Sequence, residues 1–197
     1  GSSETGKEDV DFFGTPQTSL SGPADRLRLR SMNFLLISDW KQTNQLGQAL
    51  LALERARALF LHLYGKVPQS EVQVVVNQSL EETRSQCRTS QVLGCYSPRT
   101  GIHAIILSKD AFASGTTAPA VHEYTHVVQN LMGYAWAPPW VNEGIARYYE
   151  NIEFKKGKLY VGYFDPRQRI PAWLPIDSIL TLTYDTLRKH STLKTGQ

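Results

Sequence analysis

The chain has 197 residues, of which 41% are hydrophobic and 20% are charged, as is typical of one globular domain with a core of its own. Its net charge of +3 is too small to indicate a nucleic-acid partner, and no apolar run approaches the roughly 18 residues that a membrane span needs. We therefore expect no nucleic-acid binding and no membrane span, whereas the composition says nothing of the oligomeric state.

Residues 1–27 are predicted to form a flexible tail, because Gly, Ser, Thr, Pro and acidic residues dominate this segment. The opening Gly-Ser-Ser resembles the start of a trimmed chain, which leaves open an export signal or a membrane anchor that was removed from the N-terminus. Residues 28–197 are expected to form a single domain, since no internal repeat or second boundary is visible.

The first part of this domain contains two apolar runs with a long amphipathic segment between them. Residues 32–38 and 72–77 are apolar enough to predict buried strands. Between them, leucines recur at near-helical spacing, which predicts a helix that is capped by Thr43 or Asn44, runs to about Tyr64 and ends at Gly65.

The two cysteines, Cys87 and Cys95, are eight residues apart in a polar segment that reads as a loop. Zinc sites made by cysteines usually show two closer pairs, and this pair stands alone. We predict a disulfide, which implies an oxidising, extracytoplasmic or secreted location; the alternative is two reduced thiols in a cytosolic protein.

A β-hairpin is predicted next, with strands at 94–97 and 102–108 joined by a turn that contains Pro and Gly. A helix over residues 121–132 follows, with Pro119 in its first turn. Pro138 and Pro139 then interrupt helical structure before a second helix. The remaining expected elements are that helix at 141–151, a strand at 159–164 and a short helix at 176–180.

The first of these two helices carries the sequence His122-Glu-Tyr-Thr-His126. Residues i and i+4 lie on one face of a helix, so both imidazoles can reach one metal ion. Glu123 lies beside the ion rather than facing it, where it can take a proton from a water molecule that the metal has made more acidic. The spacing therefore predicts two ligands and a base from little more than one helical turn.

Glu143 is the predicted third ligand, seventeen residues after His126 and on the helix that follows the two prolines. The proline turn can bring this helix back across the first one, and Gly144 is expected to allow close helix–helix approach. The three residues leave the fourth position of a tetrahedral ion open to water, as catalysis requires.

With these residues the chain resembles the gluzincin zinc metallopeptidases, and most closely the peptidase MA-like group. The resemblance rests on His122 to His126, on the segment Trp140-Val-Asn-Glu-Gly-Ile-Ala-Arg-Tyr148, and on the strand-turn-strand before them. It implies one Zn²⁺ ion and an α+β, zincin-like (minimal thermolysin-like) domain, with a small mixed sheet whose edge strand lies over the HExxH helix. The C-terminal helices of the family are expected to be missing or short.

The resemblance also implies a peptide or protein substrate that lies extended along an edge strand, pairing main chain to main chain. That edge strand is expected to be 102–108, which makes residues Ile102, His103, Ala104 and Ile105 candidates for substrate binding.

The sequence departs from the family pattern at two points. Many thermolysin-like members have an Asp four residues after the liganding Glu, and this chain has Arg147, so that Glu150 or Asp110 would have to orient the histidines. The oxyanion-stabilising residue expected downstream is assigned to Tyr184. The alternatives for that role are Tyr148, Tyr149, Tyr163 and His103.

The sequence thus predicts a zinc-dependent peptidase in which Glu123 is the general base. The competing hypothesis is a zinc-stabilised binding or scaffold module, or a latent peptidase whose metal is covered by another segment. The intact base beside the ligands favours the enzyme, since a structural zinc gains nothing from it. The substrate and the choice between endo- and exopeptidase are not encoded in any motif that we can interpret.

Overall fold

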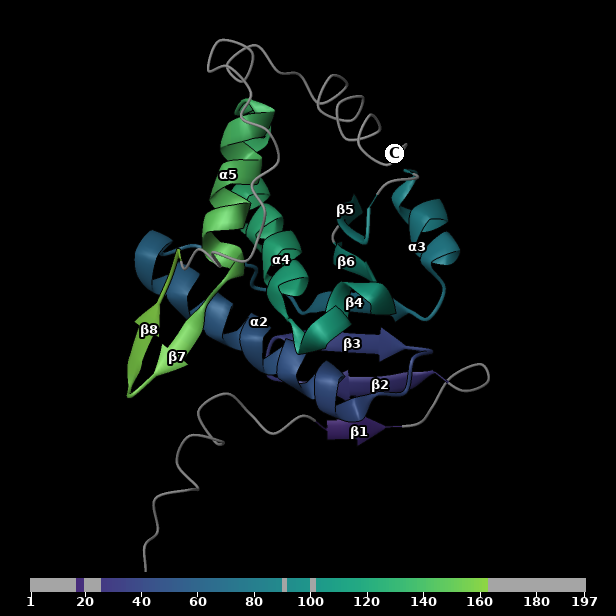
Figure 1. The fold of residues 1–197 in the computed structure, drawn as a ribbon. Helices are drawn as coiled ribbons and strands as arrows, with labels where there is room; N and C mark the ends of the chain where they lie inside the picture. Colours follow the sequence, from purple (N-terminus) through teal and green to yellow (C-terminus); the bar gives the residue numbers. More distant parts are fainter. Residues whose placement is uncertain (1–16, 20–25, 90–91, 100–101, 163–197) are drawn as a thin grey trace, which may run out of the picture.

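The computed structural model describes residues 17–19, 26–89, 92–99 and 102–162, and Figure 1 shows how their helices and strands are arranged. Within this part of the chain, six strands form one mixed sheet in the order β1-β2-β3-β4-β6-β5. The pairs β3–β4 and β4–β6 are parallel, and the other neighbours are antiparallel. The strands are β1 (Gln17–Ser19), β2 (Leu27–Arg30), β3 (Phe34–Ser38), β4 (Val72–Asn77), β5 (Gly94–Arg99) and β6 (Ile102–Ser108).

Helices cover both faces of the sheet, which confirms the predicted α+β class. Helices α2 and α4 pack on one face, α5 packs against α4, and α3 packs against β4, β5 and β6. The helices are α2 (Thr43–Tyr64), α3 (Leu80–Cys87), α4 (Ala118–Leu131) and α5 (Pro139–Glu150), with the 3₁₀ segments η1 (Lys109–Gly115) and η2 (Tyr134–Trp136) before and after α4.

The core lies between the sheet and the pair α2 and α4. Phe34 and Leu36 of β3 are fully buried, and they alternate with partly exposed neighbours because successive side chains of a strand point to opposite faces. Val72, Val74 and Val76 of β4 do the same and belong to one buried cluster with the leucines of α2. This alternation is what the apolar runs in the sequence predicted.

Helix α2 has the predicted length, but its start differs from the prediction. Gln42 is the N-cap, and no side chain caps the first turn, so neither Thr43 nor Asn44 has that role. At the other end Gly65 adopts a left-handed conformation with a φ of 64°, and its N–H donates to the carbonyl of Leu61. A glycine ends the helix here because it accepts positive φ without strain.

The strand 102–108 is not the edge of the sheet, contrary to the prediction. Ala104 and Ile105 pair with β4 on one side and with β5 on the other, so no extended peptide can add to them. Among the described strands, the outermost one on this side is β5. The physical reason is visible in the side chains: β6 is apolar and buried on both faces, as an internal strand requires, whereas Pro98 of β5 has no N–H to donate and suits an edge.

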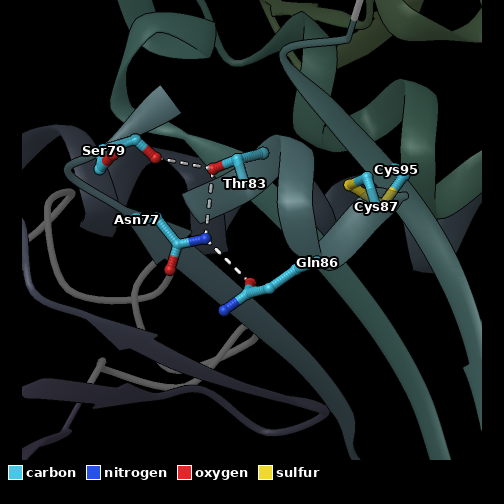
Figure 2. Close-up of a disulfide and its surroundings, with 6 residues drawn as sticks. All are labelled: Asn77, Ser79, Thr83, Gln86, Cys87 and Cys95. Atoms are coloured by element: carbon cyan, nitrogen blue, oxygen red, sulfur yellow. Dashed lines mark hydrogen bonds between the residues drawn. A yellow bond between two sulfur atoms is a disulfide. The ribbon is translucent and has the colours of Figure 1, made fainter. Parts of the chain in front are cut away.

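The disulfide between Cys87 and Cys95 is present, as predicted, and the segment before it forms a helix that was not predicted. Residues 80–87 form α3, whose N-cap Ser79 accepts a hydrogen bond from the N–H of Glu82. Figure 2 shows the disulfide joining the end of α3 to β5, and the side chain of Asn77 donating to Thr83 and Gln86 of the same helix. The disulfide therefore ties the edge strand to the helix behind it.

The two ends of the domain differ from the prediction or lie beyond what is described. The strand β1 falls within the segment expected to be a tail and pairs with β2. The single strand expected at 159–164 is instead part of a hairpin, β7 (Glu153–Lys155) and β8 (Lys158–Tyr160). The helix expected at 176–180 lies outside the described residues.

Candidate metal centre

Two neighbouring helices bring together the three predicted ligands. His122 and His126 lie one turn apart on α4, and their Nε2 atoms are 3.2 Å from each other. Glu143 lies on α5, with one carboxylate oxygen 3.3 Å from Nε2 of His122 and the other 3.6 Å from Nε2 of His126. The three side chains form a group that could hold a metal ion.

The turn between the helices positions Glu143, as the prolines suggested. Pro138 is the N-cap of α5 and Pro139 lies in its first turn, where the missing N–H costs nothing. The side-chain amide of Asn142 donates to the carbonyls of Tyr134 and Ala137 in the connection. These contacts fix the first turn of α5, and Glu143 follows directly. Gly144 is not required for close packing, because a Cβ there would meet nothing within 4 Å.

Hydrogen bonds on the far side of each imidazole set the direction of its Nε2. Nδ1–H of His122 donates to Glu150 over 2.9 Å, and Nδ1–H of His126 donates to the side-chain oxygen of Gln129 over 2.8 Å. A proton on Nδ1 leaves the Nε2 lone pair free for a cation. The Gln129 amide also donates to the main-chain carbonyl of Asn142, which links His126 to the helix that carries Glu143.

The separations fit a small tetrahedral cation. Two ligand atoms that lie about 2.0–2.1 Å from one ion, at the tetrahedral angle, are about 3.3 Å apart. The two Nε2 atoms are 3.2 Å apart, and the two carboxylate oxygens of Glu143 lie 3.3 and 3.6 Å from the nearer Nε2, within a few tenths of an ångström of this value. Two imidazoles and one carboxylate also form a donor set that leaves a fourth position for a water molecule.

Glu150 orients His122, and Asp110 does not. Glu150 is on α5, seven residues after Glu143, and its side chain is only 5% exposed. Nη1 of Arg147 donates to both carboxylate oxygens of Glu150 over 3.1 and 3.2 Å. The carboxylate of Asp110 instead accepts a hydrogen bond from the hydroxyl of Ser108, and the same hydroxyl caps η1 by accepting the N–H of Asp110. The carboxylate expected four residues after Glu143 is thus replaced by one that lies a turn further along.

The carboxylates around His122 strongly favour its charged form. Burial opposes the charge, but hydrogen bonds to Glu143 and Glu150 and the charge of Glu123 outweigh burial and raise the pKa of His122 to about 9. Burial alone would raise the pKa of Glu143, yet the hydrogen bond from His122 and the nearby positive charges hold it below its usual value. Burial lowers the pKa of His126. Without a metal ion, a proton on His122 thus balances the charge of the carboxylates.

Glu123 has the environment of a proton carrier. Burial raises its pKa to about 7, although the charge of His122 and a hydrogen bond from the backbone of Tyr96 act in the opposite direction. A group that takes and returns a proton works best when its pKa lies near the working pH. Tyr96 belongs to the edge strand β5, so Glu123 lies next to that edge.

The candidate oxyanion residues that the structure describes make contacts with residues other than the three ligands. The hydroxyl of Tyr149 bonds to that of Tyr64, and the ring of Tyr148 packs against Gly162. His103 bonds to the hydroxyl of Tyr96. Tyr163 and Tyr184 lie outside the described residues.

Two residues near the site were not predicted from the sequence. Gln129 lies three residues after His126, on the same helical face, and that spacing could have identified it. Tyr96 lies on β5, and its hydroxyl bonds to His103 and to Asn130 of α4. No spacing in the sequence predicts this contact, because three separate elements meet there.

The chain matches no protein-family model, no curated protein and no solved structure. The candidate site therefore stands on its own geometry. No described helix is both long enough and apolar enough to cross a membrane. The disulfide is compatible with an extracytoplasmic location.

Proposed function

We propose that the chain is a zinc-dependent peptidase of the gluzincin type, with His122, His126 and Glu143 as the ligands and Glu123 as the general base. The observation that carries the proposal is the convergence of two imidazole Nε2 atoms, 3.2 Å apart, with the carboxylate of Glu143, whose two oxygens lie 3.3 and 3.6 Å from them, next to a carboxyl group whose pKa is near 7. Two imidazoles and a carboxylate with an open fourth position are the usual donor set of catalytic zinc in peptidases.

The residues divide the chemical work in a simple way. A zinc ion held by these ligands would make a water molecule acidic and polarise the carbonyl of the scissile peptide bond. Glu123 would take the proton of the attacking water and return it to the leaving amine. Glu150 and Gln129 would keep both Nδ1 atoms protonated, so that each imidazole keeps its Nε2 lone pair for the ion.

The substrate is proposed to lie along β5 rather than β6. In the antiparallel pair β5–β6, the N–H of Ser108 donates to the carbonyl of Leu93, and residues two apart share the same side of a strand. The main-chain groups of Tyr96 therefore face away from β6, toward the open edge and toward Glu123. An extended peptide at this edge would have its backbone next to the base.

The fold and the location belong to the same proposal. A mixed sheet with an edge strand beside the HExxH helix, followed by a helix that bears the third ligand, supports a zincin-like domain. The disulfide supports secretion or an extracytoplasmic location, with or without an anchor.

The test is a digest of a broad peptide library by the whole chain, with zinc and with a chelator. Metal-dependent fragments are expected from the parent. The variant Glu123→Gln should keep zinc and lose about 10²- to 10⁴-fold in rate, since it removes the proton carrier alone. If the parent binds zinc and gives no metal-dependent fragments, the chain is a zinc-stabilised binding module or a latent peptidase. If Glu123→Gln cleaves as fast as the parent, the mechanism is wrong.

A further inference from the structure

The carboxylate of Glu150 has partners on both sides. One oxygen accepts the Nδ1–H of His122 over 2.9 Å, and both oxygens accept from Nη1 of Arg147 over 3.1 and 3.2 Å. The side chain of Glu150 is 5% exposed, whereas that of Arg147 is 70% exposed. A buried carboxylate depends on the donors around it, because it cannot turn to water for replacements.

We propose that Arg147 is a positioning residue for the metal centre: it fixes the carboxylate of Glu150, which fixes the ring of His122, and in this way it sets the affinity for zinc. The proposal rests on the metal site of the proposed function, but not on peptide hydrolysis. It assigns a role to the position where the gluzincin pattern has a different residue.

The geometry separates this role from a simple surface ion pair. An exposed pair holds two mobile side chains and contributes little. Here one partner, the carboxylate of Glu150, is buried and bonded to the imidazole of His122. The guanidinium of Arg147 therefore fixes the carboxylate that orients a metal ligand. Without Arg147, Glu150 would keep a single donor among the described residues and could rotate about its last torsion angle, and the Nδ1–H of His122 would lose its fixed acceptor.

The positive charge of Arg147 also supports its role at the metal centre. Three carboxylates, from Glu123, Glu143 and Glu150, lie around the two imidazoles, and the charge of Arg147 acts on each of them. Removing that charge takes away the positive charge that offsets all three carboxylates, and it leaves the buried Glu150 without the guanidinium that favours its charged form. A lysine would restore the charge and one donor but not the planar guanidinium, so it should restore most of the affinity and not all of it.

The experiment measures zinc affinity by competition with a chromophoric chelator at one fixed pH. The chain is tested as parent, Arg147→Met, Arg147→Lys, Glu150→Gln and the double variant Arg147→Met with Glu150→Gln. The matched control is Arg30→Met, which removes an exposed arginine from an ion pair of 2.9 Å with Glu71, away from the metal centre. The absorption of bound Co²⁺ gives a second readout that does not depend on activity.

If Arg147 acts through Glu150, the effects of the two substitutions on zinc affinity should not add up. Glu150→Gln should weaken zinc binding by about 10- to 100-fold, and Arg147→Met by about tenfold. In the Glu150→Gln background, Arg147→Met should add less than about twofold, because the group through which it acts is gone. Arg147→Lys should recover most of the loss, and Arg30→Met should change nothing. The Co²⁺ spectrum should change in Arg147→Met and not in the control.

Two results would overturn the inference: an unchanged zinc affinity in Arg147→Met, or an equal loss in both backgrounds. Should Glu150→Gln fail to fold, the Arg147→Met and Arg147→Lys pair still decides, because an exposed arginine can be replaced without loss of the core. A parent that binds zinc but cuts no peptide refutes the peptidase and leaves this inference intact. A parent that cuts peptides while Arg147→Met keeps full affinity refutes only this inference. A parent that binds no zinc refutes both.

Discussion

A proton and a metal ion compete for His122, so the affinity of the site for zinc should rise with pH. The perturbation is a change of pH from 6 to 8 in the parent chain. Hydrogen bonds to Glu143 and Glu150 overcome the effect of burial and raise the pKa of His122 to about 9. Below that pKa, each pH unit increases the deprotonated fraction about tenfold, and only this fraction can bind the ion.

The expected gain in apparent affinity is therefore about 100-fold between pH 6 and pH 8. A histidine with an ordinary pKa of about 6.5 would give only about fourfold over the same interval. Chelator competition at the two pH values measures the ratio, and calorimetry in two buffers of different ionisation enthalpy counts the released proton. A gain below about fivefold would refute the idea that the carboxylates hold His122 protonated.

The same shift makes a statement about the fold without zinc. The pKa of His122 is about 9 in the folded chain and about 6.5 in the unfolded chain, so the charged form stabilises the fold. This contribution is fully present below about pH 6.5 and is lost as the pH rises through 9. Urea unfolding in a chelator should show lower stability at pH 9.5 than at pH 6. The variant Glu150→Gln, which removes the negative charge of one of the two hydrogen-bonded carboxylates, should weaken this dependence.

Three further predictions concern the fold, and urea unfolding measures each of them. Cys87→Ser with Cys95→Ser opens a loop of about nine residues and should cost about 2.5 kcal/mol by the chain-entropy relation; no loss would mean that α3 alone holds β5. Tyr124→Phe removes a buried hydroxyl that has no hydrogen-bond partner within the described part of the chain, and should leave stability unchanged or about 1 kcal/mol higher. A loss of stability of that size would show that the Tyr124 hydroxyl does have a hydrogen-bond partner. Gly94→Ala puts a Cβ 2.5 Å from Leu107 Cδ2 and 2.9 Å from the Ile106 carbonyl, and should cost about 1–3 kcal/mol. Gly47→Ala, where a Cβ meets nothing within 4 Å, is the control and should not destabilise.

Local sequence patterns predicted the features that depend only on residues close together in the chain. The helix α2, the strand β4 and the histidine pair of α4 were all found from periodicity, because a helical or extended backbone alone fixes which side chains share a face. The helix α3 was missed although Ser79 and Glu82 have the spacing of a capping box. The polar composition of that segment outweighed this signal, since the disulfide rather than an apolar stripe anchors the helix.

Pairing between strands was harder to predict, because it depends on residues far apart in the chain. The hairpin of β5 and β6 was expected, but the sequence pattern did not show which strand would pair with β4. The burial of the side chains explains why β6, and not β5, pairs with β4. Residues 104–107 are buried on both faces, while β5 contains a proline and a glycine that leaves no room for a Cβ. Two-sided burial is a property of internal strands, and it identifies β6 as one of them.

The metal centre shows the same division between local and distant information. One helical turn supplies His122 and His126, so their convergence could be predicted; the choice of Glu150 over Asp110 could not, because it depends on how α5 crosses α4. The structure explains why that crossing is well defined. Gln129 joins His126 to the main chain of α5, and Glu150 joins α5 back to His122. The contacts that orient both imidazoles are thus the contacts that hold the two helices together, and any change that shifts α5 must also shift the ligands.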